Sequence, residues 1–359
     1  MRDLPRAAVS GPDLDALYEA VRSWFAPAAL EEAMGPAELG TEAAAREYLA
    51  TGGKRWRPLL AACAYAALRE DGETGWPAAL RRTAVAVECF HKASLIHDDI
   101  EDGDTERYGR QALHVRLGVA AALNVGDFLV GEGYRLLGDL AVADECKARL
   151  LRAAAQGHRS LCLGQGRELE ALRAPFPPTV QEVLAIFRGK TGPAFEAAVR
   201  VGAAVAGTGE DLWPMLGRYG EALGVAYQIR DDLEDGVPEA EAGEGGGRSR
   251  RAGIVLALAL ERATGEAKAL LEDMWRGSRS AGAARELERI VEATRAEEAA
   301  RGLLESYCIE AEAALAPAAD RPLGHILRQV AERMFEGMGA RQAQKLTCVK
   351  DAVSGRRIE

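Results

Sequence analysis

The chain has 359 residues, of which 48% are hydrophobic and 28% charged, and its formal net charge is −10 at pH 7. This composition is typical of a folded globular protein and excludes a disordered chain. The acidic balance argues against a nucleic-acid partner, and it means that an anionic substrate would need local positive side chains or bridging cations.

Helices dominate the predicted structure. Alanine and leucine recur in nearly every segment, whereas alternating runs of β-branched residues are absent, so we expect an all-α fold. Pro58 suits the opening of one helix, and Thr179 with Glu182 makes a capping box at another. In chain order, the predicted helices cover residues 13–33, 41–50, 58–69, 77–102, 116–137, 143–172, 179–188, 193–206 and 211–236, and the stretch 252–346 is helical again.

Two segments are predicted to lie outside the helices. The Gly-rich, charged segment 237–250 favours a mobile loop over a phosphate cradle, because no strand precedes its glycines and no Gly-Lys-Ser/Thr follows them. Residues 345–359 form a basic tail. We therefore expect one helical domain over residues 1–359.

The sequence also predicts a reducing, cytoplasmic location. The six cysteines are scattered without a pair at metal-ligand spacing, so we interpret them as free thiols. The opening residues MRDLPRAAVSG lack the apolar stretch of a secretory signal. The longest apolar run, AGIVLALAL at 252–260, is far shorter than the ~20 residues that span a bilayer.

Two acidic clusters of the same order, IHDDIEDGD at 96–104 and IRDDLEDG at 229–236, end two of the predicted helices. At helical spacing Asp98 and Asp102 share one face, and the second cluster repeats this geometry. Crowded carboxylates repel one another, so each cluster needs a positive partner. A solvated helix end is the ordinary alternative, but apolar residues precede both copies, which favours metal ligands. The candidate ligands are six aspartates: Asp98, Asp99, Asp102, Asp231, Asp232 and Asp235.

The ion that suits these clusters is Mg²⁺. An EF-hand calcium loop starting at Asp98 would need oxygen ligands where the chain has Ile100 and Gly109, and the second copy fails at the same two places. Hard oxygen ligands in a short, open array suit Mg²⁺, which keeps waters and shares the phosphate oxygens of a substrate. Two arrays facing each other would let an acidic chain bind an acidic diphosphate through metal bridges.

Two basic segments complete the predicted site. TGGKRWRP at 51–58 places Lys54, Arg55 and Arg57 at a Gly-Gly turn before a helix start, where free backbone N–H groups favour an anion. Guanidinium groups add bidentate phosphate recognition. RGKTG at 188–192 holds a lone lysine between glycine and threonine and also resembles a phosphate contact. A basic surface turn stays open as the alternative for the first segment.

Taken together, GGKRWRP, His91 upstream of HDDIED, GKTG and YQIRDDLED resemble the trans-isoprenyl diphosphate synthase (polyprenyl synthetase) family in order and spacing, over residues 45–260. The resemblance implies a bundle of the isoprenoid synthase type, usually a homodimer. It implies a Mg²⁺-dependent prenyltransferase that condenses an allylic diphosphate with isopentenyl diphosphate.

The same resemblance assigns roles to individual residues. The six aspartates match the metal ligands, and the catalytic positions are Asp98, Asp99, Lys190 and Asp231. Around the allylic diphosphate the matching residues are Arg107, Lys190 and Gln228, with Thr191 as a further substrate-binding position. At the isopentenyl diphosphate site they are Lys54, Arg57 and His91, whereas Arg55 has no firm role.

Three departures from the family pattern affect the second substrate site more than the ionisation site. Tyr108 stands where the family usually has a second arginine, so one isopentenyl diphosphate contact loses its charge. The Gly-Gln-x-x-Asp element of the family ends here in Glu168. The lysine expected after the second cluster is absent, and Arg250 or Arg251 must serve instead.

The residues before the first cluster bear on product length. Ala93 and Ser94 are small, whereas a bulky aromatic at these positions stops chain growth early in this family. Phe90 lies about 12 Å back from Asp98 along the helix axis, where it is either a floor of the cavity or ordinary core. The resemblance implies a product of about C20 or longer.

Two other functions stay open. A terpene cyclase-like lyase, or a transferase to another acceptor, would ionise the allylic diphosphate without isopentenyl diphosphate, and Tyr108 is the feature that favours it. A non-catalytic diphosphate-binding subunit is the other, and the intact aspartates of both clusters argue against it.

Overall fold

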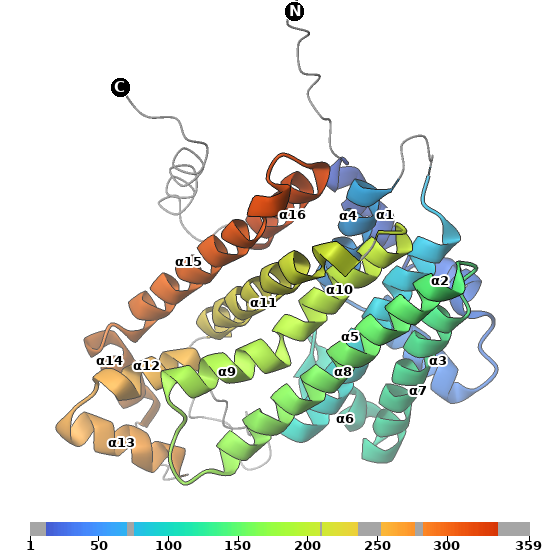
Figure 1. The fold of residues 1–359 in the computed structure, drawn as a ribbon. Helices are drawn as coiled ribbons and strands as arrows, with labels where there is room; N and C mark the ends of the chain where they lie inside the picture. The colour runs from blue at the N-terminus through green and yellow to red at the C-terminus, as the bar shows by residue number, and fades with distance from the viewer. Residues whose placement is uncertain (1–11, 70–74, 209, 236–252, 277–282, 337–359) are drawn as a thin grey trace, which may run out of the picture.

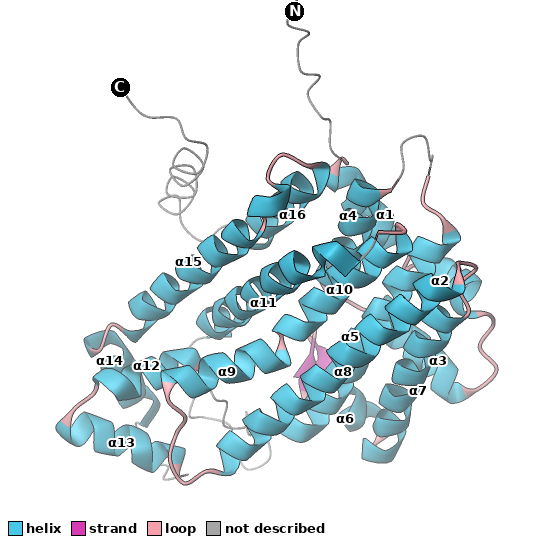
Figure 2. Ribbon diagram, in the orientation of Figure 1, coloured by secondary structure: helices cyan, strands magenta, loops and turns pink. Residues whose placement is uncertain are grey.

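The computed structural model describes residues 12–69, 75–208, 210–235, 253–276 and 283–336. This part of the chain is a bundle of helices with one short hairpin (Figures 1 and 2). The helices of the first half are α1 (Leu14–Ser23), α2 (Pro27–Met34), α3 (Gly40–Ala50), α4 (Trp56–Leu68), α5 (Ala78–Asp102), α6 (Leu113–Leu117), α7 (Val119–Gly138) and α8 (Asp144–Arg173). Those of the second half are α9 (Val180–Lys190), α10 (Gly192–Val205), α11 (Trp213–Asp235), α12 (Ile254–Arg262), α13 (Gly265–Trp275), α14 (Ala283–Ala293), α15 (Ala296–Ala314) and α16 (Pro322–Met334), with short 3₁₀ turns at Glu210–Leu212 and Ala316–Ala318.

Helix α10 lies in the middle of the bundle, in contact with α4, α8 and α11 (Figure 1). Its small residues allow close approach: a methyl group on Gly202 would lie 2.1 Å from the carbonyl oxygen of Ala61 in α4. Helix α5 packs along α7, and α11 packs along both α10 and α15. Both helices that carry acidic clusters are thus held by long contacts on each side, which fixes where their carboxyl ends lie.

The all-α prediction is confirmed, and its exceptions have local causes. The helix predicted over 13–33 is two helices, because Pro27 starts α2 and cannot continue α1. Gly118, with φ of 84°, separates α6 from α7. The predictions contained no strands, but a two-stranded antiparallel hairpin, β1 (Glu106–Arg107) and β2 (Arg110–Gln111), follows α5.

Several predictions lie outside the described residues. They concern the Gly-rich loop at 237–250, the basic side chains Arg250 and Arg251, and the tail at 345–359. The cysteines within the described part are free, as predicted. None of the described helices has the length and apolar character needed to cross a membrane.

Candidate active site

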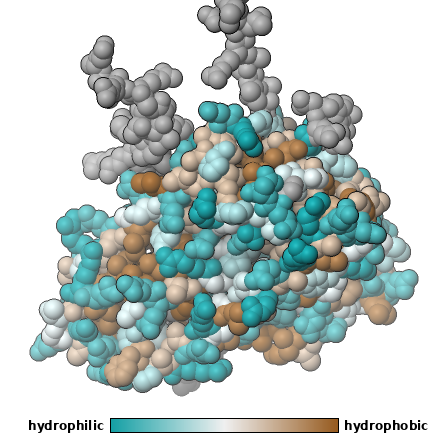
Figure 3. All heavy atoms as spheres, in the orientation of Figure 1, coloured by the Kyte–Doolittle hydropathy of each residue, from teal (hydrophilic) through white to brown (hydrophobic). Residues whose placement is uncertain are grey.

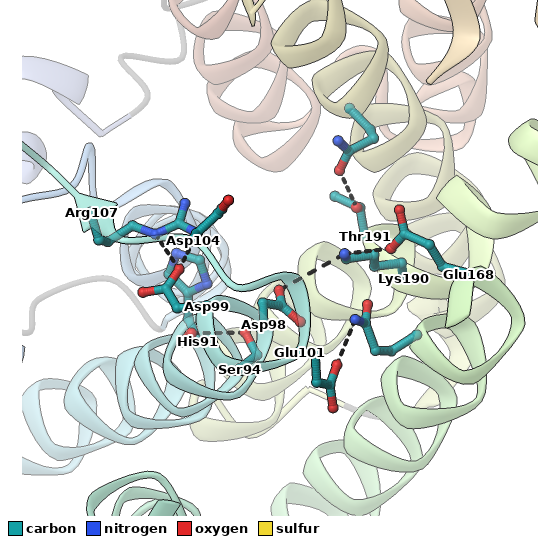
Figure 4. A network of polar contacts seen from close by, with 12 residues as sticks. His91, Ser94, Asp98, Asp99, Glu101, Asp104, Arg107, Glu168, Lys190 and Thr191 are labelled. Carbon is teal, nitrogen blue, oxygen red and sulfur yellow. Dashed lines mark hydrogen bonds and ion pairs between the residues drawn. The ribbon is translucent and has the colours of Figure 1, made fainter. Parts of the chain in front are cut away.

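The first acidic cluster, near the end of α5, faces Lys190 at the end of α9. Asp98 Oδ2 lies 4.0 Å from Lys190 Nζ, and this ammonium donates a hydrogen bond to Glu168 Oε2 at 2.6 Å. Figure 4 shows Lys190 between Asp98 and Glu168, which come from two different helices. Burial alone would lower the Lys190 pKa, but the carboxylates of Asp98 and Glu168 outweigh it and raise the pKa. Lys190 is therefore a firmly charged ammonium.

The second acidic cluster borders the same lysine from α11. The Thr191 hydroxyl donates to Gln228 Oε1 at 2.9 Å, and the Gln228 side chain hydrogen-bonds Asp232. The charge of Glu168 also acts on Asp232. The two clusters, far apart in sequence, thus share the Lys190–Glu168 ion pair as a neighbour.

Two glycines set the position of that ion pair. A methyl group on Gly164 of α8 would lie 2.1 Å from the carbonyl carbon of Gly189, so a larger residue there would displace the backbone. Lys190 follows Gly189, and Glu168 lies one turn after Gly164 on α8. The close approach of the two backbones therefore brings the ammonium and the carboxylate into hydrogen-bonding range.

Arg107 lies on the hairpin and is paired with the first cluster. Its Nε donates to Asp99 Oδ1 at 2.8 Å, a terminal nitrogen bonds the same oxygen, and Asp104 Oδ2 lies 3.4 Å from that nitrogen. In Figure 4, Asp99 and Asp98 lie on different sides of α5, one toward Arg107 and the other toward Lys190. Each of these two aspartates thus has its own basic partner.

Burial raises the pKa of carboxyl groups in both clusters. The pKa of Asp98 is raised to about 6, although Lys190 opposes the shift. The pKa of Asp232 is raised to about 7, although the Ile254 N–H, which donates to Asp232 Oδ2 at 2.7 Å, opposes it. Burial of these groups is incompletely compensated, so a further cation would stabilise their ionised forms.

The other aspartates also offer hard oxygen donors. Asp99 Oδ2 is buried and has no hydrogen-bond partner within the described residues, and Asp231 accepts from Arg230 at 2.8 Å. Asp102 is half-buried, and Asp235 is exposed at the end of α11. Among the described side chains no group of three His, Cys, Asp or Glu is arranged to hold a metal ion by itself. The carboxylate oxygens of both clusters are hard donors, the type that Mg²⁺ takes together with water and phosphate oxygens.

A separate basic pocket of about 250 Å³ lies beside the start of α4. It contains the three positions predicted for the second diphosphate, and its walls come from the Gly-Gly turn, α4, α5, the hairpin and α11. Its lining residues are Gly53, Lys54, Arg55, Trp56, Arg57, Glu88, His91, Tyr108 and Tyr227.

Inside this pocket His91 supports Arg57. His91 Nε2 lies 3.2 Å from a terminal nitrogen of Arg57, which only donates, so the ring nitrogen accepts. Burial, together with the nearby Arg57 charge, holds the pKa of His91 well below its usual range. His91 is therefore neutral, and its contribution is to orient the guanidinium.

The side chain of Arg55 is buried and bonds groups in the protein interior. Its guanidinium forms a buried ion pair with Glu88, bonds the Leu49 carbonyl oxygen, and lies 4.2 Å from the ring centre of Phe25. Arg55 also has φ of 56°, which turns the chain into α4. Lys54 and Arg57 are the other two basic side chains that line the pocket.

The sequence predictions missed Glu88, Trp56 and Tyr227 as pocket residues. Glu88 could have been predicted, because it lies one turn before His91 on the helix predicted over 77–102 and therefore shares its face. Trp56 and Tyr227 look like ordinary core aromatics in the sequence. Only the packing of α4 and α11 against α10 brings Tyr227 to this wall, beside Phe195 of α10.

Phe90 packs within the bundle below the first cluster. Its ring lies edge-on to Tyr134 at 4.8 Å between centroids and 6.2 Å from the ring of His158. A methyl group on Gly133 would lie 2.7 Å from the Phe90 ring, so α7 has a notch for it. Phe90 is partly buried. With Tyr134 and His158 it forms an aromatic layer between α5, α7 and α8.

The chain was compared with known proteins. The polyprenyl synthetase family matches residues 40–294. The short chain isoprenyl diphosphate synthase of Methanocaldococcus jannaschii is 35% identical over 193 residues, which span 54% of this chain but only 56% of that protein. The farnesyl diphosphate synthase of Escherichia coli is 36% identical over 234 residues, spanning 62% of this chain and 76% of that protein.

A solved structure has the same fold. It is the geranylgeranyl pyrophosphate synthase from Corynebacterium glutamicum, complexed with isoprenyl diphosphate and magnesium, with a TM-score of 0.74 and 25% identity. The superposition covers 90% of this chain and 99% of that one. On its all-α fold and on the family match over most of its length, the chain belongs to the polyprenyl synthetase family, the trans-isoprenyl diphosphate synthases.

Proposed function

We propose that the protein is a Mg²⁺-dependent prenyltransferase that joins an allylic diphosphate to isopentenyl diphosphate and releases a longer trans-prenyl diphosphate. The observation that carries the proposal is the pairing of two different anion sites. One is the Lys190 centre between both acidic clusters, and the other is the separate basic pocket with Lys54 and Arg57.

The Lys190 centre suits ionisation of the allylic substrate. Breaking its C–O bond leaves a carbocation and adds negative charge to the diphosphate, and Lys190 supplies positive charge where it develops. Thr191 and Gln228 border the same region, and Arg107, paired with Asp99 on the other side of α5, completes the proposed allylic site. Mg²⁺ held by the six aspartates would neutralise the leaving diphosphate as a Lewis acid.

The basic pocket suits the second substrate. Lys54 and Arg57 would bind the diphosphate of isopentenyl diphosphate, with Arg57 held by the neutral His91. The isopentenyl double bond then attacks the cation and a proton is lost. The reaction requires that water, which would otherwise trap the cation, be excluded from the space between the two sites.

A second anion pocket also weighs against the alternatives. A lyase that ionises one allylic diphosphate needs a single diphosphate site, whereas condensation needs two. Tyr108 in the basic pocket keeps the lyase, or transfer to another acceptor, as the second candidate, because it brings no charge to that wall.

The remaining features of the proposal follow the family. We expect one domain, a reducing cytoplasmic location in keeping with the free thiols, and a product of about C20 or longer with the Phe90 layer as its floor. We also expect a homodimer formed through the exposed apolar side chains of α6 and α7.

One assay tests the reaction and its residues. Purified protein is given Mg²⁺ and geranyl or farnesyl diphosphate, with and without isopentenyl diphosphate, and the products are identified by mass. Longer diphosphates that form only with isopentenyl diphosphate are expected, whereas hydrocarbons or alcohols formed without it would support the lyase.

The same assay applied to Asp98→Ala and Asp231→Ala should show turnover reduced by about 1,000-fold or more, because each change removes a proposed metal ligand. Asp144→Ala is the matched control, since Asp144 is fully exposed in the first turn of α8. Turnover at the wild-type rate in either of the first two variants would remove the metal assignment.

A further inference from the structure

Lys92 is a fully buried lysine that the proposed reaction does not use. It follows His91 on α5, and its side chain is 0% exposed. Its ammonium donates to the Thr51 carbonyl oxygen at 2.7 Å and to the Gly52 carbonyl oxygen at 3.3 Å. Lys92 thus binds the backbone of the Gly-Gly turn that carries Lys54 and Arg57.

Tyr108 closes the other side of the same turn. Its ring centre lies 4.2 Å from Lys92 Nζ, a cation–π contact, and a methyl group on Gly52 would lie 3.0 Å from that ring. Tyr108 reaches this place from the hairpin tip with φ of 54°. The ring of Tyr48 flanks the ammonium at 5.1 Å. The turn is therefore held between a buried cation and an aromatic cap.

The Lys92 ammonium lies directly behind the pocket wall. A methyl group on Gly53 would lie 3.4 Å from the Tyr108 hydroxyl and 3.8 Å from Lys92 Nζ, and Gly53 and Tyr108 both line the pocket. Because Glu88 neutralises Arg55, the positive charges at the pocket are those of Lys54, Arg57 and Lys92. In this low-dielectric setting the field of a buried ammonium reaches the pocket with little screening.

We propose that Lys92 is a positioning residue for the basic pocket: it fixes the Gly52–Gly53 turn and adds a third positive charge behind the wall formed by Gly53 and Tyr108. The inference rests on the proposed function, in which this pocket takes the diphosphate of isopentenyl diphosphate. Lys92 and Tyr108 together replace the charge that an arginine at position 108 would bring directly.

Burial of an ammonium is a poor way to stabilise a fold, which supports a functional reason for Lys92. Burial lowers its pKa to about 8, even though Glu88 opposes the shift. A methionine would fill the same space without a charge.

The test compares three variants by steady-state kinetics: Lys92→Met, Lys92→Arg and, as matched control, Lys268→Met on the exposed face of α13. Lys92→Met should raise the KM for isopentenyl diphosphate by about 10- to 100-fold and change the KM for the allylic diphosphate by less than about 2-fold. Lys92→Arg should recover part of the loss, and Lys268→Met should behave as wild type.

A second part of the experiment moves the positive charge from position 92 to position 108. In Lys92→Met/Tyr108→Arg the guanidinium replaces the missing ammonium, so the KM for isopentenyl diphosphate should return toward the wild-type value. Tyr108→Arg alone sets two cations against each other and should not improve on wild type. If Lys92→Met fails to fold, Tyr108→Leu tests the same contact, since Tyr108 is 42% exposed, and it should raise the same KM.

The outcomes separate the two levels of proposal. A wild-type enzyme that elongates with isopentenyl diphosphate, while Lys92→Met and Tyr108→Leu leave its KM unchanged or raise both KM values equally, would overturn the role of Lys92 alone. A wild-type enzyme that turns over allylic diphosphate without ever consuming isopentenyl diphosphate would overturn the proposed function itself.

Discussion

Lys190 and Lys92 are both shielded from water, yet their surroundings shift their pKa values in opposite directions. Around Lys190 the carboxylates of Asp98 and Glu168 outweigh burial and raise its pKa. Around Lys92 burial outweighs the single carboxylate of Glu88 and lowers the pKa to about 8. Lys190 is thus a charged ammonium paired with carboxylates, whereas Lys92 is a buried ammonium close to the basic pocket with carbonyl oxygens as its hydrogen-bond acceptors.

The lowered pKa of Lys92 predicts a pH dependence of stability. Its folded-state pKa, about 8, lies below the ordinary value of 10.5, so folding is penalised while both states are protonated. The penalty disappears as pH rises from about 8 to 10.5. Wild type should therefore gain stability relative to Lys92→Met over this window, on the order of 3 kcal/mol.

Urea unfolding of both proteins at pH 7, 9 and 10.5 measures the difference. The groups that face Lys92 (Glu88, Arg55, Arg107, Tyr48 and Tyr108) are common to both chains, so their own titration largely cancels. Parallel stability profiles from pH 7 to 10.5 would contradict the prediction.

For individual residues, the sequence predicted which side chains line the basic pocket better than it predicted their protonation and pairing. Lys54, Arg57 and His91 do lie in one pocket. Their protonation and pairing depend on tertiary burial, which is why neither the neutral state of His91 nor the Arg55–Glu88 ion pair could be predicted. Both need the contact of α5 with the turn before α4.

Among the elements, most predicted helices, including the short ones at 41–50, 179–188 and 193–206, agree with the structure within two residues, whereas the break between α1 and α2 and the hairpin were not predicted. The ends of α5 and α11, which carry the acidic clusters, agree with the predictions because hydrophobic periodicity accumulates over many turns. The hairpin of β1 and β2 has two residues in each strand, too few for any periodicity. It was missed, although it carries both Arg107 and Tyr108.

The contact between α8 and α9 provides a prediction about an element. Gly164→Ala should lower the free energy of unfolding by about 1–3 kcal/mol and reduce turnover, because the methyl group forces the Gly189 backbone and Lys190 away from Glu168. Gly166→Ala is the control, since nothing lies within 4 Å of a methyl group there. That variant should keep wild-type turnover and gain about 0.5–1 kcal/mol from helix propensity. Equal effects of the two changes would show that the helix contact does not position Lys190.

For the whole molecule, a sequence without its fold does not reveal which helices face each other. The repeated clusters suggested a shared cavity, but their approach to one lysine depends on α9 and α10 crossing between α8 and α11. On the face that Figure 3 shows, hydrophilic and hydrophobic residues are mixed. The exposed apolar residues of α6 and α7 are the basis of the proposed interface.

The expected homodimer gives the last prediction. Val115, Leu117, Val119 and Leu123 are each more than 40% exposed on α6 and α7, and Val119 and Leu123 are one turn apart. Leu123→Lys should shift the protein to monomers in sedimentation velocity, because it places a charge in the proposed interface. Phe176→Lys, which changes an exposed side chain after α8, should leave the sedimentation coefficient unchanged. A Leu123→Lys protein that sediments as wild type would exclude this face.

The position of Lys190 has a consequence for the order in which ligands arrive. Its ammonium lies between Asp98 and Glu168, where the proposed metal would bind, and Arg107 is paired with Asp99 in the same way. A bare divalent ion would have to compete with these built-in counter-ions, whereas a metal that arrives with its diphosphate offers each of them a new anionic partner. Under the proposed function, metal and allylic diphosphate should therefore bind cooperatively, each weakly alone and tightly together.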